Sequence, residues 1–318
     1  MNEALIKQAG SKLLKAQRIL LVSHIRPDGD AVGSLIGLGL ALQEAGKSTQ
    51  WVLTDGVPAS THHLPGAQSI VRQPEGKFDF AVVMDCSDLN RVGEALDGYG
   101  MPDLNIDHHI TNLNFARVNL VQPEAASTSE ILTTLLLIWG LRITQPIATA
   151  LLTGIISDTL GFRTSNVTPQ TLRIAADLME TGGDLATLYH ETLLQRSFST
   201  ARYWGAGLSK IQRQDRLVWT ALTLSDRRAA KYPGRDDADL INILSSIDEA
   251  DISIVFVEQT RGHVKVSWRS RPGFDVAQIA LHFGGGGHKA AAGADVPGTL
   301  EEIQSKVLDA TRAILKAA

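Results

Sequence analysis

The sequence predicts an α/β protein with a parallel-sheet domain followed by a smaller α/β domain. Three observations support this fold class. The chain has 318 residues, which is more than a single hydrophobic core usually organises. Short apolar runs alternate with helical patterns up to about residue 182, as in βαβ units. Beyond residue 215 the pattern changes to a β-hairpin flanked by helices. We therefore expect a first domain at 1–185, a helical connector at 186–214 and a second domain at 215–318.

The first domain should contain a mostly parallel sheet with helices on both faces. An amphipathic helix is expected at the N-terminus, and strands are expected at 18–24, 49–54, 78–85 and 103–107. The run 78–85 is continuously apolar, which is typical of a parallel strand buried on both faces. Helices are expected at 31–45, 127–140, 146–157 and 168–182. Ser127 and Glu130 have the spacing of a capping box, and Pro146 suits the first turn of a helix.

The second domain should contain an antiparallel hairpin. A strand is expected at 216–224 and a helix at 237–247. The segment 252–271 reads as two strands around a turn at 260–262. A helix at 275–283, a glycine loop at 284–287 and a closing helix at 299–316 complete the domain.

Composition narrows the class of protein. Hydrophobic residues make up 44% of the chain and charged residues 20%, as in ordinary globular proteins. There is neither a signal-peptide pattern nor an apolar run long enough to span a membrane, so neither is expected. Cys86 is the only cysteine, which fits a reducing cytoplasm. A net charge of −4 argues against coating of long duplex nucleic acid, but not against a small phosphorylated ligand.

Polar clusters stand where the expected strands or helices end. The first cluster follows strand 18–24, the second ends strand 78–85, the third ends strand 103–107, and the fourth lies in "GIISDTLGF". In order, they are His24 with Asp28 and Asp30, then Asp85, then Asp107 with His108 and His109, then Asp158. Ligands of open parallel sheets bind beyond the carboxyl ends of the strands. We therefore expect all four clusters to meet in one site.

The expected site would carry several negative charges, which cations would have to balance. Asp28, Asp30, Asp85 and Asp158 would place four carboxylates together, and their mutual repulsion would raise their pKa values. Two divalent ions would balance four negative charges. Carboxylate and imidazole donors without a thiolate suit Mn²⁺, Mg²⁺ or Co²⁺. Such a pair of ions is typical of enzymes that cleave phosphate esters.

Each residue also has a simpler interpretation when it is taken alone. An isolated aspartate at a strand end is usually a helix cap or turn former, and we assign Asp88 to that role. Cys86 is interpreted as a small core residue. The joint pattern of aspartates and histidines at successive element ends favours a metal site.

At these residues the chain resembles the DHH phosphoesterase family. The matching segments are "SHIRPDGDA" (23–31), "VVMDCSD" (82–88), "NIDHH" (105–109) and "IISDTLGF" (155–162), and "FGGGGHKAAAGA" (283–294) is similar to the signature of the DHHA1 domain. The resemblance covers nearly the whole chain and implies a cleft between the DHH and DHHA1 domains. One departure concerns the residue after Ser-Asp-Thr, where the family often has glycine and this chain has Leu160.

The resemblance implies a role for each residue of the site. One ion would be held by His24, Asp28 and Asp85, and the second by Asp30, Asp85, His108 and Asp158, with Asp85 bridging. Asp107 would orient the site, and His109 would face the substrate phosphate. Mn²⁺ is the ion most expected.

The second domain should supply the substrate contacts. Glycine lets backbone N–H groups approach an anion, and arginine binds phosphate through two parallel hydrogen bonds. The expected contacts are Gly285, Gly286, Gly287, His288, Arg269 and Arg163. Arg271 and Phe162 are interpreted instead as an exposed charge and a core residue.

The resemblance implies short nucleotides as substrates. They are short oligoribonucleotides, linear dinucleotides and 3′-phosphoadenosine 5′-phosphate (pAp), as for the stand-alone nanoRNase and pAp-phosphatase members of the family. A cyclic dinucleotide (c-di-AMP) phosphodiesterase is the closest alternative, and a nucleotide-binding sensor without turnover is an alternative of another class. A homodimer is compatible with the sequence.

Overall fold

Two compact units make up the structure, a computed structural model that describes residues 2–317. The first unit ends at Gln195 and the second begins at Arg196. The interval 186–214, expected to be a helical connector, is divided between them. It contains the end of one helix, a single π-helical turn, a second helix and a short strand, so it is not helical throughout.

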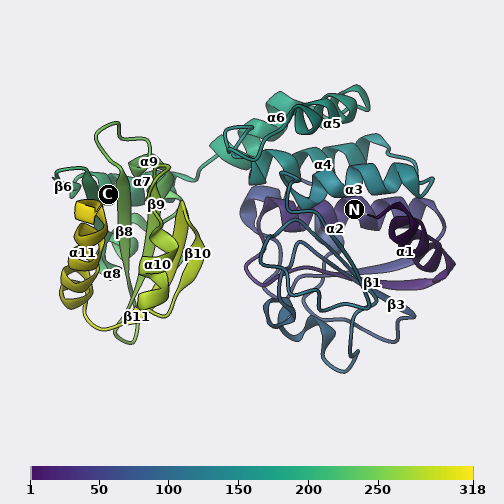
Figure 1. Ribbon diagram of the computed structural model, residues 1–318, viewed down its shortest axis with the longest axis horizontal. Coiled ribbons are helices and arrows are strands. Elements are labelled where there is room, and N and C mark those ends of the chain that lie inside the picture. Colours follow the sequence, from purple (N-terminus) through teal and green to yellow (C-terminus); the bar gives the residue numbers. More distant parts are fainter. Residues whose placement is uncertain (1, 318) are drawn as a thin grey trace. The chain divides into compact units, whose positions relative to one another are not determined.

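The sheet of the first unit has five strands, and all of its pairings are parallel (Figure 1). The strand order is β2-β1-β3-β4-β5, which confirms the predicted α/β class. Its strands are β1 (Arg18–Val22), β2 (Ser48–Val52), β3 (Phe80–Met84), β4 (Leu104–Asp107) and β5 (Val118–Val121). Strand β5 was not predicted, because its four residues are too few to show a clear pattern.

Helices cover one face of this sheet. They are α1 (Glu3–Lys15), α2 (Gly29–Glu44), α3 (Thr128–Ile138), α4 (Gln145–Asp158), α5 (Pro169–Glu180) and α6 (Leu185–Tyr189), and a π-helical turn, η4 (His190–Leu194), follows α6. Figure 1 shows α2, α3, α4 and α5 in successive layers. The core between α1–α4 and the sheet includes Leu35, Leu132 and Leu151, none of which is exposed.

The prediction of helices on both faces was wrong. The second face is covered by η3 (Leu89–Leu96), a 3₁₀ segment, together with partly buried Phe78, Tyr99 and Phe115. The connection from β3 to β4 contains Gly93, Gly98 and Gly100, all at positive φ, and these glycines leave no room for a regular helix. Two further 3₁₀ turns, η1 (Ala59–Thr61) and η2 (Ala67–Ser69), follow β2.

The second unit is built on a six-stranded mixed sheet of order β10-β11-β9-β8-β7-β6. Its strands are β6 (Gln212–Gln214), β7 (Leu217–Leu222), β8 (Ile252–Gln259), β9 (His263–Ser270), β10 (Gly286–His288) and β11 (Ala291–Pro297). Only the pairing of β7 with β8 is parallel. The predicted hairpin is confirmed as β8 and β9. Of the expected glycine loop, Gly286 and Gly287 instead belong to strand β10, which pairs with β11.

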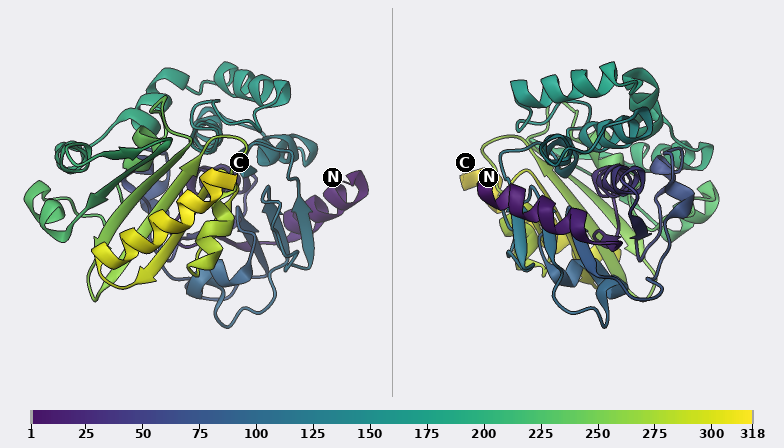
Figure 2. Two further views of the ribbon diagram at one scale, coloured as in Figure 1. Left: turned by 60° about the vertical axis from the view of Figure 1, so that its left-hand side comes forward. Right: turned by 90° about the vertical axis from the view of Figure 1, so that its right-hand side faces the viewer.

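Helices pack on both faces of the second sheet. They are α7 (Phe198–Leu208), α8 (Leu224–Ala230), α9 (Leu240–Leu244), α10 (Val276–His282) and α11 (Leu300–Ala317). Helices α10 and α11 cover the face that carries Trp268, and Figure 2 shows them side by side. On the other face, α7, α8 and α9 cover β7 and β8, as shown by the core of Tyr203, Leu240 and Val255.

Candidate metal centre

The expected ligands of the first unit come together at the carboxyl edge of its sheet. His24 follows β1, Asp85 follows β3, and His108 and His109 follow β4. Asp28 caps the N-terminus of α2, where its Oδ1 accepts hydrogen bonds from the N–H groups of Asp30 and Ala31, each at 3.0 Å. Asp158 is the last residue of α4.

Three overlapping groups of side chains are positioned to hold metal ions. They are His24, Asp28 and Asp85; then Asp85, His108 and His109; then Asp30, His108 and Asp158, with the donor atoms of each group within 4.8 Å of one another. Asp85 and His108 each belong to two groups. The structure thus brings together all seven of these residues, which lie between 24 and 158 in the sequence.

The distances inside the cluster fit ligands arranged around an ion. His24 Nε2 lies 3.5 Å from Asp85 Oδ2, and His108 Nε2 lies 3.3 Å from Asp158 Oδ2 and 3.7 Å from Asp85 Oδ1. Most of these separations are too long for a hydrogen bond. Ligands that share an ion at about 2.0–2.2 Å stand roughly 3–4 Å apart. The donor set of carboxylate oxygen and imidazole nitrogen, without sulfur, also fits a divalent cation.

The surrounding backbone fixes the orientation of the ligands. Asp30 is fully buried and accepts hydrogen bonds from the N–H groups of Thr128 (2.6 Å) and Ser129 (3.0 Å), at the start of α3. The Thr128 hydroxyl donates to Asp85 Oδ1 at 3.1 Å. Nδ1 of His24 donates to the Ile25 carbonyl at 2.8 Å, which directs Nε2 to the cluster. No local sequence pattern indicates that the backbone of Thr128 and Ser129 binds a residue almost 100 positions away.

Asp85 combines burial with a strained backbone. Its residue is 1% exposed, and its φ of 53° lies in the left-handed region. Aspartate tolerates this conformation better than most residues, yet it still costs about 1–3 kcal/mol. The turn directs the carboxylate to three histidines, since His24, His108 and His109 all lie within 3.7 Å of it.

His109 belongs to a different network within the same cluster. Its Nδ1 lies 2.7 Å from Asp107 Oδ1, and Asp107 is fully buried at the end of β4. Asn112 donates to Asp107 Oδ2 at 2.5 Å and to Asn105 Oδ1 at 2.8 Å. Asn112 and Asn105 were not singled out in the sequence. The only signal for Asn112 is its place five residues after Asp107, on the loop that follows β4.

Burial and crowding shift the pKa values of the cluster. Burial and the charge of Asp85 raise the pKa of Asp30 to about 7, and burial with the neighbouring aspartates raises the pKa of Asp158 well above its usual value. Burial opposes protonation of His24, but the negative charges of Asp85 and Asp28 raise the pKa of His24 to about 9. The protein without cations therefore takes up protons here to balance its carboxylates.

These shifts predict how the stability of the metal-free protein depends on pH. A carboxyl or imidazole whose pKa is raised on folding binds its proton more tightly in the folded state, so stability falls as pH rises. For Asp30 the loss occurs as pH rises from about 4 to 7, and for His24 as it rises from about 6.5 to 9. We expect the Tm of EDTA-treated protein to fall by roughly 5 °C or more between pH 6 and pH 9. Saturating Mn²⁺ should greatly reduce this fall; the same slope with and without Mn²⁺ would contradict the prediction.

The backbone after Asp158 contains three successive left-handed residues. Leu160, Gly161 and Phe162 have φ values of 48°, 71° and 66°. Leu160 is the residue that follows Ser157, Asp158 and Thr159, and it is 39% exposed. Phe162 packs against the core as expected, and Arg163 is exposed on the loop five residues beyond Asp158.

Leu160→Gly should stabilise the protein, because glycine adopts a left-handed conformation without steric cost. The gain should be about 0.5–1 kcal/mol after allowing for the greater freedom of glycine in the unfolded chain. Urea unfolding of the metal-free protein measures it. Gly161→Ala is the matched control and should destabilise, since its new Cβ would lie 2.2 Å from Tyr189 Cε2. Equal or lower stability of Leu160→Gly would contradict the strain argument.

The expected substrate contacts of the second unit lie on one sheet. Arg269 is on β9 and donates from Nη1 to the Trp268 carbonyl at 3.0 Å. Gly286, Gly287 and His288 form β10, and Gly285 precedes it. Ala291 of β11 pairs with Arg269 on one side and with His288 on the other, so these two side chains flank a single alanine. Arg271 pairs with the exposed Asp248 at 3.2 Å.

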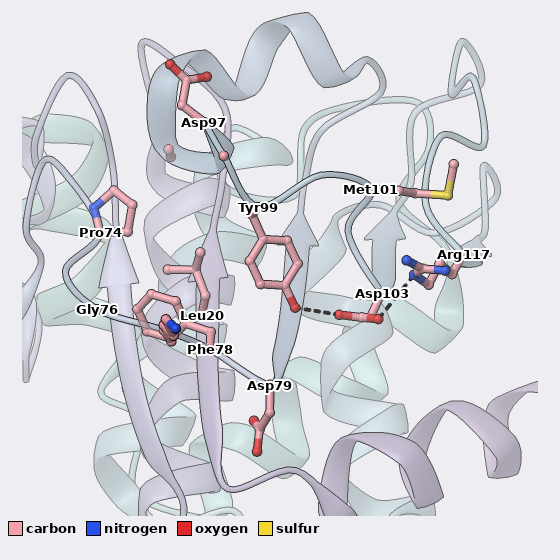
Figure 3. Close-up of a pocket in the computed structure, with 13 residues that line it drawn as sticks. Leu20, Pro74, Gly76, Phe78, Asp79, Asp97, Tyr99, Met101, Asp103 and Arg117 are labelled. Atoms are coloured by element: carbon pink, nitrogen blue, oxygen red, sulfur yellow. Dashed lines mark hydrogen bonds and ion pairs between the residues drawn. The ribbon is translucent and has the colours of Figure 1, made fainter.

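A pocket of about 570 Å³ opens at the opposite, amino-terminal edge of the first sheet (Figure 3). Asp103 accepts a hydrogen bond from the Tyr99 hydroxyl at 2.8 Å and lies 3.4 Å from Nε of Arg117. Asp79 accepts from the backbone N–H groups of Gln17 and Arg18, each at 2.9 Å. These polar groups hold the loops of this edge together, and the expected ligand residues do not line the pocket.

Comparison with known proteins identifies the family to which this fold belongs. The DHH family, N-terminal domain, matches residues 18–155, and the DHHA1 domain matches residues 230–317. The chain is 36% identical to the bifunctional oligoribonuclease and PAP phosphatase NrnA of Thermus thermophilus, over 95% of this chain and 92% of that protein. It is 25% identical to the cyclic-di-AMP phosphodiesterase GdpP of Geobacillus thermodenitrificans, over 94% of this chain but 48% of that protein.

A solved structure shows the same architecture. The exopolyphosphatase-related protein from Bacteroides fragilis matches with a TM-score of 0.90 at 26% identity, over 99% of this chain and 96% of that chain. Fold, cluster and relatives together define a hydrolase that acts on phosphate esters. More specifically, the chain belongs to the DHH family and carries both the DHH and the DHHA1 domain. No helix within residues 2–317 is both long and apolar enough to cross a membrane.

Proposed function

We propose that this protein hydrolyses short oligoribonucleotides and linear dinucleotides to mononucleotides, and pAp to AMP, with two divalent ions, most suitably Mn²⁺. The observation that carries the proposal is the cluster of four carboxylates and three imidazoles in overlapping groups. The substrate class is supported by the relative from Thermus thermophilus, which spans nearly the whole chain. Mg²⁺ and Co²⁺ suit the same donors.

The ligand sets are those that the resemblance to the DHH family implies. His24, Asp28 and Asp85 would hold one ion, and Asp30, Asp85, His108 and Asp158 would hold the second, with Asp85 shared. Of the second set, Asp30, His108 and Asp158 form one group in the structure, and Asp85 belongs to the groups of His24 and of His108. When bound, such a pair supplies a water acidic enough to attack phosphorus and positive charge for the phosphate oxygens. The protein itself keeps the ligands in place through the start of α3 and largely excludes bulk water from Asp30 and Asp85.

His109 is assigned to the substrate phosphate rather than to an ion. Burial opposes protonation of this imidazole, but the hydrogen bond that its Nδ1 donates to Asp107 raises the pKa of His109 above its usual value. This shift favours the imidazolium form of His109. It can donate a proton to the leaving oxygen as the phosphorus–oxygen bond breaks, or stabilise the charge that develops on the phosphate.

The second unit is proposed to bind the nucleotide through Arg269, His288 and the backbone of 285–287, with Arg163 of the first unit as a further phosphate contact.

Arg269→Ala should raise KM about 10- to 100-fold and leave kcat nearly unchanged. The reason is that a contact with a phosphate that does not react stabilises the bound substrate and the transition state equally. Arg271→Ala is the matched control and should change KM less than about twofold. A fall in kcat alone for Arg269→Ala would instead place this residue in the transition state.

The function is tested with a panel of substrates. The purified chain is incubated with Mn²⁺ and pApA, pGpG, a 5-mer RNA, pAp, cyclic di-AMP or pyrophosphate, and products are separated by chromatography with an EDTA control. Conversion of linear dinucleotides and short RNA to mononucleotides, with cyclic di-AMP intact, supports the proposal. Efficient opening of cyclic di-AMP favours the alternative that the Geobacillus relative suggests. Binding without turnover across the panel would indicate a nucleotide sensor.

The proposal also includes the cellular compartment and the oligomeric state of the protein. The reducing cytoplasm is the proposed compartment, supported by a single cysteine, Cys86, which is buried and unpaired by disulfide. A homodimer that acts on short single strands rather than long duplexes is the proposed working form. Sedimentation of the purified chain at several concentrations tests the oligomeric state.

A further inference from the structure

A short segment of the first unit, 125–130, contacts one side of the candidate metal centre. Its backbone at the start of α3 donates two hydrogen bonds to Asp30. The Ala125 carbonyl lies 3.3 Å from Nδ1 of His108, and this contact directs Nε2 of the ring to the cluster. The segment thus orients two ligands of the group that also includes Asp158.

Asp158 is connected to the same segment through the chain that follows it. The loop 159–168 joins α4, which ends at Asp158, to α5. Nδ2 of Asn166 on this loop donates to the Ala126 carbonyl at 3.3 Å. All three ligands of the group are therefore linked to the segment 125–130, two of them directly and Asp158 through its loop.

Glu130 holds this segment in place. Its residue is 5% exposed, and its Oε2 accepts hydrogen bonds from the Ala126 N–H at 3.0 Å and from the Thr171 hydroxyl at 2.9 Å. In the capping box that the spacing of Ser127 and Glu130 predicted, the carboxylate would bind the N–H of Ser127 itself. The carboxylate instead binds the preceding N–H. Because Thr171 lies in the first turn of α5, Glu130 joins the segment to that helix.

The remaining ligands are supported differently. His24 is oriented by the carbonyl of the next residue, and Asp28 by the N–H groups at the start of α2. In the part of the chain that the structure describes, neither residue is hydrogen-bonded to the segment 125–130. Asp85, shared by the two ligand sets, accepts one hydrogen bond from the Thr128 hydroxyl. The segment therefore supports the second proposed ion much more than the first.

We propose that Glu130 is a positioning residue for the second ion, the one that Asp30, His108 and Asp158 would hold. This inference rests on the proposed function for the presence of two ions. Glu130 is hydrogen-bonded to the segment and to α5 rather than to any ligand, so it acts through the backbone that orients the ligands. Loss of such a supporting group weakens metal binding about 10- to 100-fold. The loss should fall on one ion, because the ligands of the first ion are oriented by other groups.

Binding of Mn²⁺ to the full chain tests this role without turnover. Calorimetry should give two bound ions for wild type. Glu130→Ala should bind the first ion within about twofold of the wild-type affinity and the second about 10- to 100-fold more weakly. In electron paramagnetic resonance, the signal of a coupled Mn²⁺ pair should disappear at a Mn²⁺ concentration that just saturates wild type. Glu130→Gln should recover most of the loss, because its amide oxygen can still accept from the Ala126 N–H.

Two further variants keep the test decisive if Glu130→Ala fails to fold. Thr171→Val removes the hydroxyl that donates to Glu130 and nearly keeps the size of the side chain, so the second ion should bind about 3- to 10-fold more weakly. Glu258→Ala is the matched control in the second unit, where half-buried Glu258 accepts the Leu224 N–H at 2.9 Å. It should leave both Mn²⁺ affinities within about twofold of wild type, even if its Tm falls.

The outcomes separate this role from general stability and from catalysis. Unchanged Mn²⁺ binding in Glu130→Ala or Thr171→Val would overturn the inference, and so would an equal weakening of both ions. Equal losses in Glu130→Ala and Glu130→Gln would also overturn it, because the charge of Glu130 rather than its hydrogen bonds would then be responsible. If Mn²⁺ binding responds as expected but no substrate of the panel is cleaved, the proposed function fails and the positioning role stands.

Discussion

The Asp85→Asn variant should lose at least about a thousandfold in kcat, equivalent to about 4 kcal/mol of transition-state stabilisation. Asp85 is the carboxylate shared by two of the three ligand groups, so its loss affects both proposed ions at once. Asparagine keeps the size of the side chain but removes the charge that faces His24, His108 and His109. Activity measured across a range of Mn²⁺ concentrations, with Mn²⁺ binding by calorimetry, checks both consequences.

The matched control is Asp88→Asn, three residues further along the chain. Asp88 caps η3 through the Asn90 N–H at 2.9 Å, and asparagine is an equally good cap. This variant should keep kcat and Mn²⁺ binding within about twofold of wild type. The pKa of His24, raised to about 9 mainly by Asp85 against the effect of burial, should fall in Asp85→Asn, which NMR titration of the metal-free protein can follow. Wild-type turnover by Asp85→Asn would refute the two-ion assignment.

The sequence predicted the centre of the first unit because parallel strands end at a common edge. His24, Asp85 and the Asp107–His109 run each follow an apolar strand, and that local pattern is sufficient to place them. Asp158 was placed by its position at the end of a helix. The hydrogen bonds from the backbone of Thr128 and Ser129 to Asp30 were not predictable. They depend on how α3 packs against α2, and neither segment carries a sequence pattern for that packing.

The second unit was harder to predict for a related reason. The run 284–288 has almost no side chains, so neither alternation nor β-propensity marks it as a strand. Its strand character comes from pairing with β11, whose small residues admit the glycine backbone closely. A sequence pattern identifies the glycines, and only the structure shows at which of them a Cβ would collide with the neighbouring strand, as at Gly285 and Gly287.

The His109→Asn variant should lose about 10²- to 10⁴-fold in kcat while Mn²⁺ binding stays within about twofold of wild type. His109 is close enough to Asp85 and His108 to be a third imidazole ligand. Its Nδ1, however, is bound to Asp107 at 2.7 Å, as for a histidine held in one orientation for proton transfer. His108→Asn is the matched variant of the neighbouring residue, and it should weaken Mn²⁺ binding strongly. Equal loss of Mn²⁺ binding in the two variants would make His109 a ligand instead.

The pH dependence of kcat separates the proton-donor role of His109 from simple positioning. Asp107 raises the pKa of His109 through a hydrogen bond and its charge, although burial opposes this effect. Asp107→Asn removes the charge, so the imidazole should lose its proton at a lower pH. If His109 acts as an acid, the alkaline limb of the kcat profile should move to lower pH in Asp107→Asn, and Asn112 should still hold the neutral side chain in place. A lower kcat with an unmoved alkaline limb would mean that Asp107 only orients the ring.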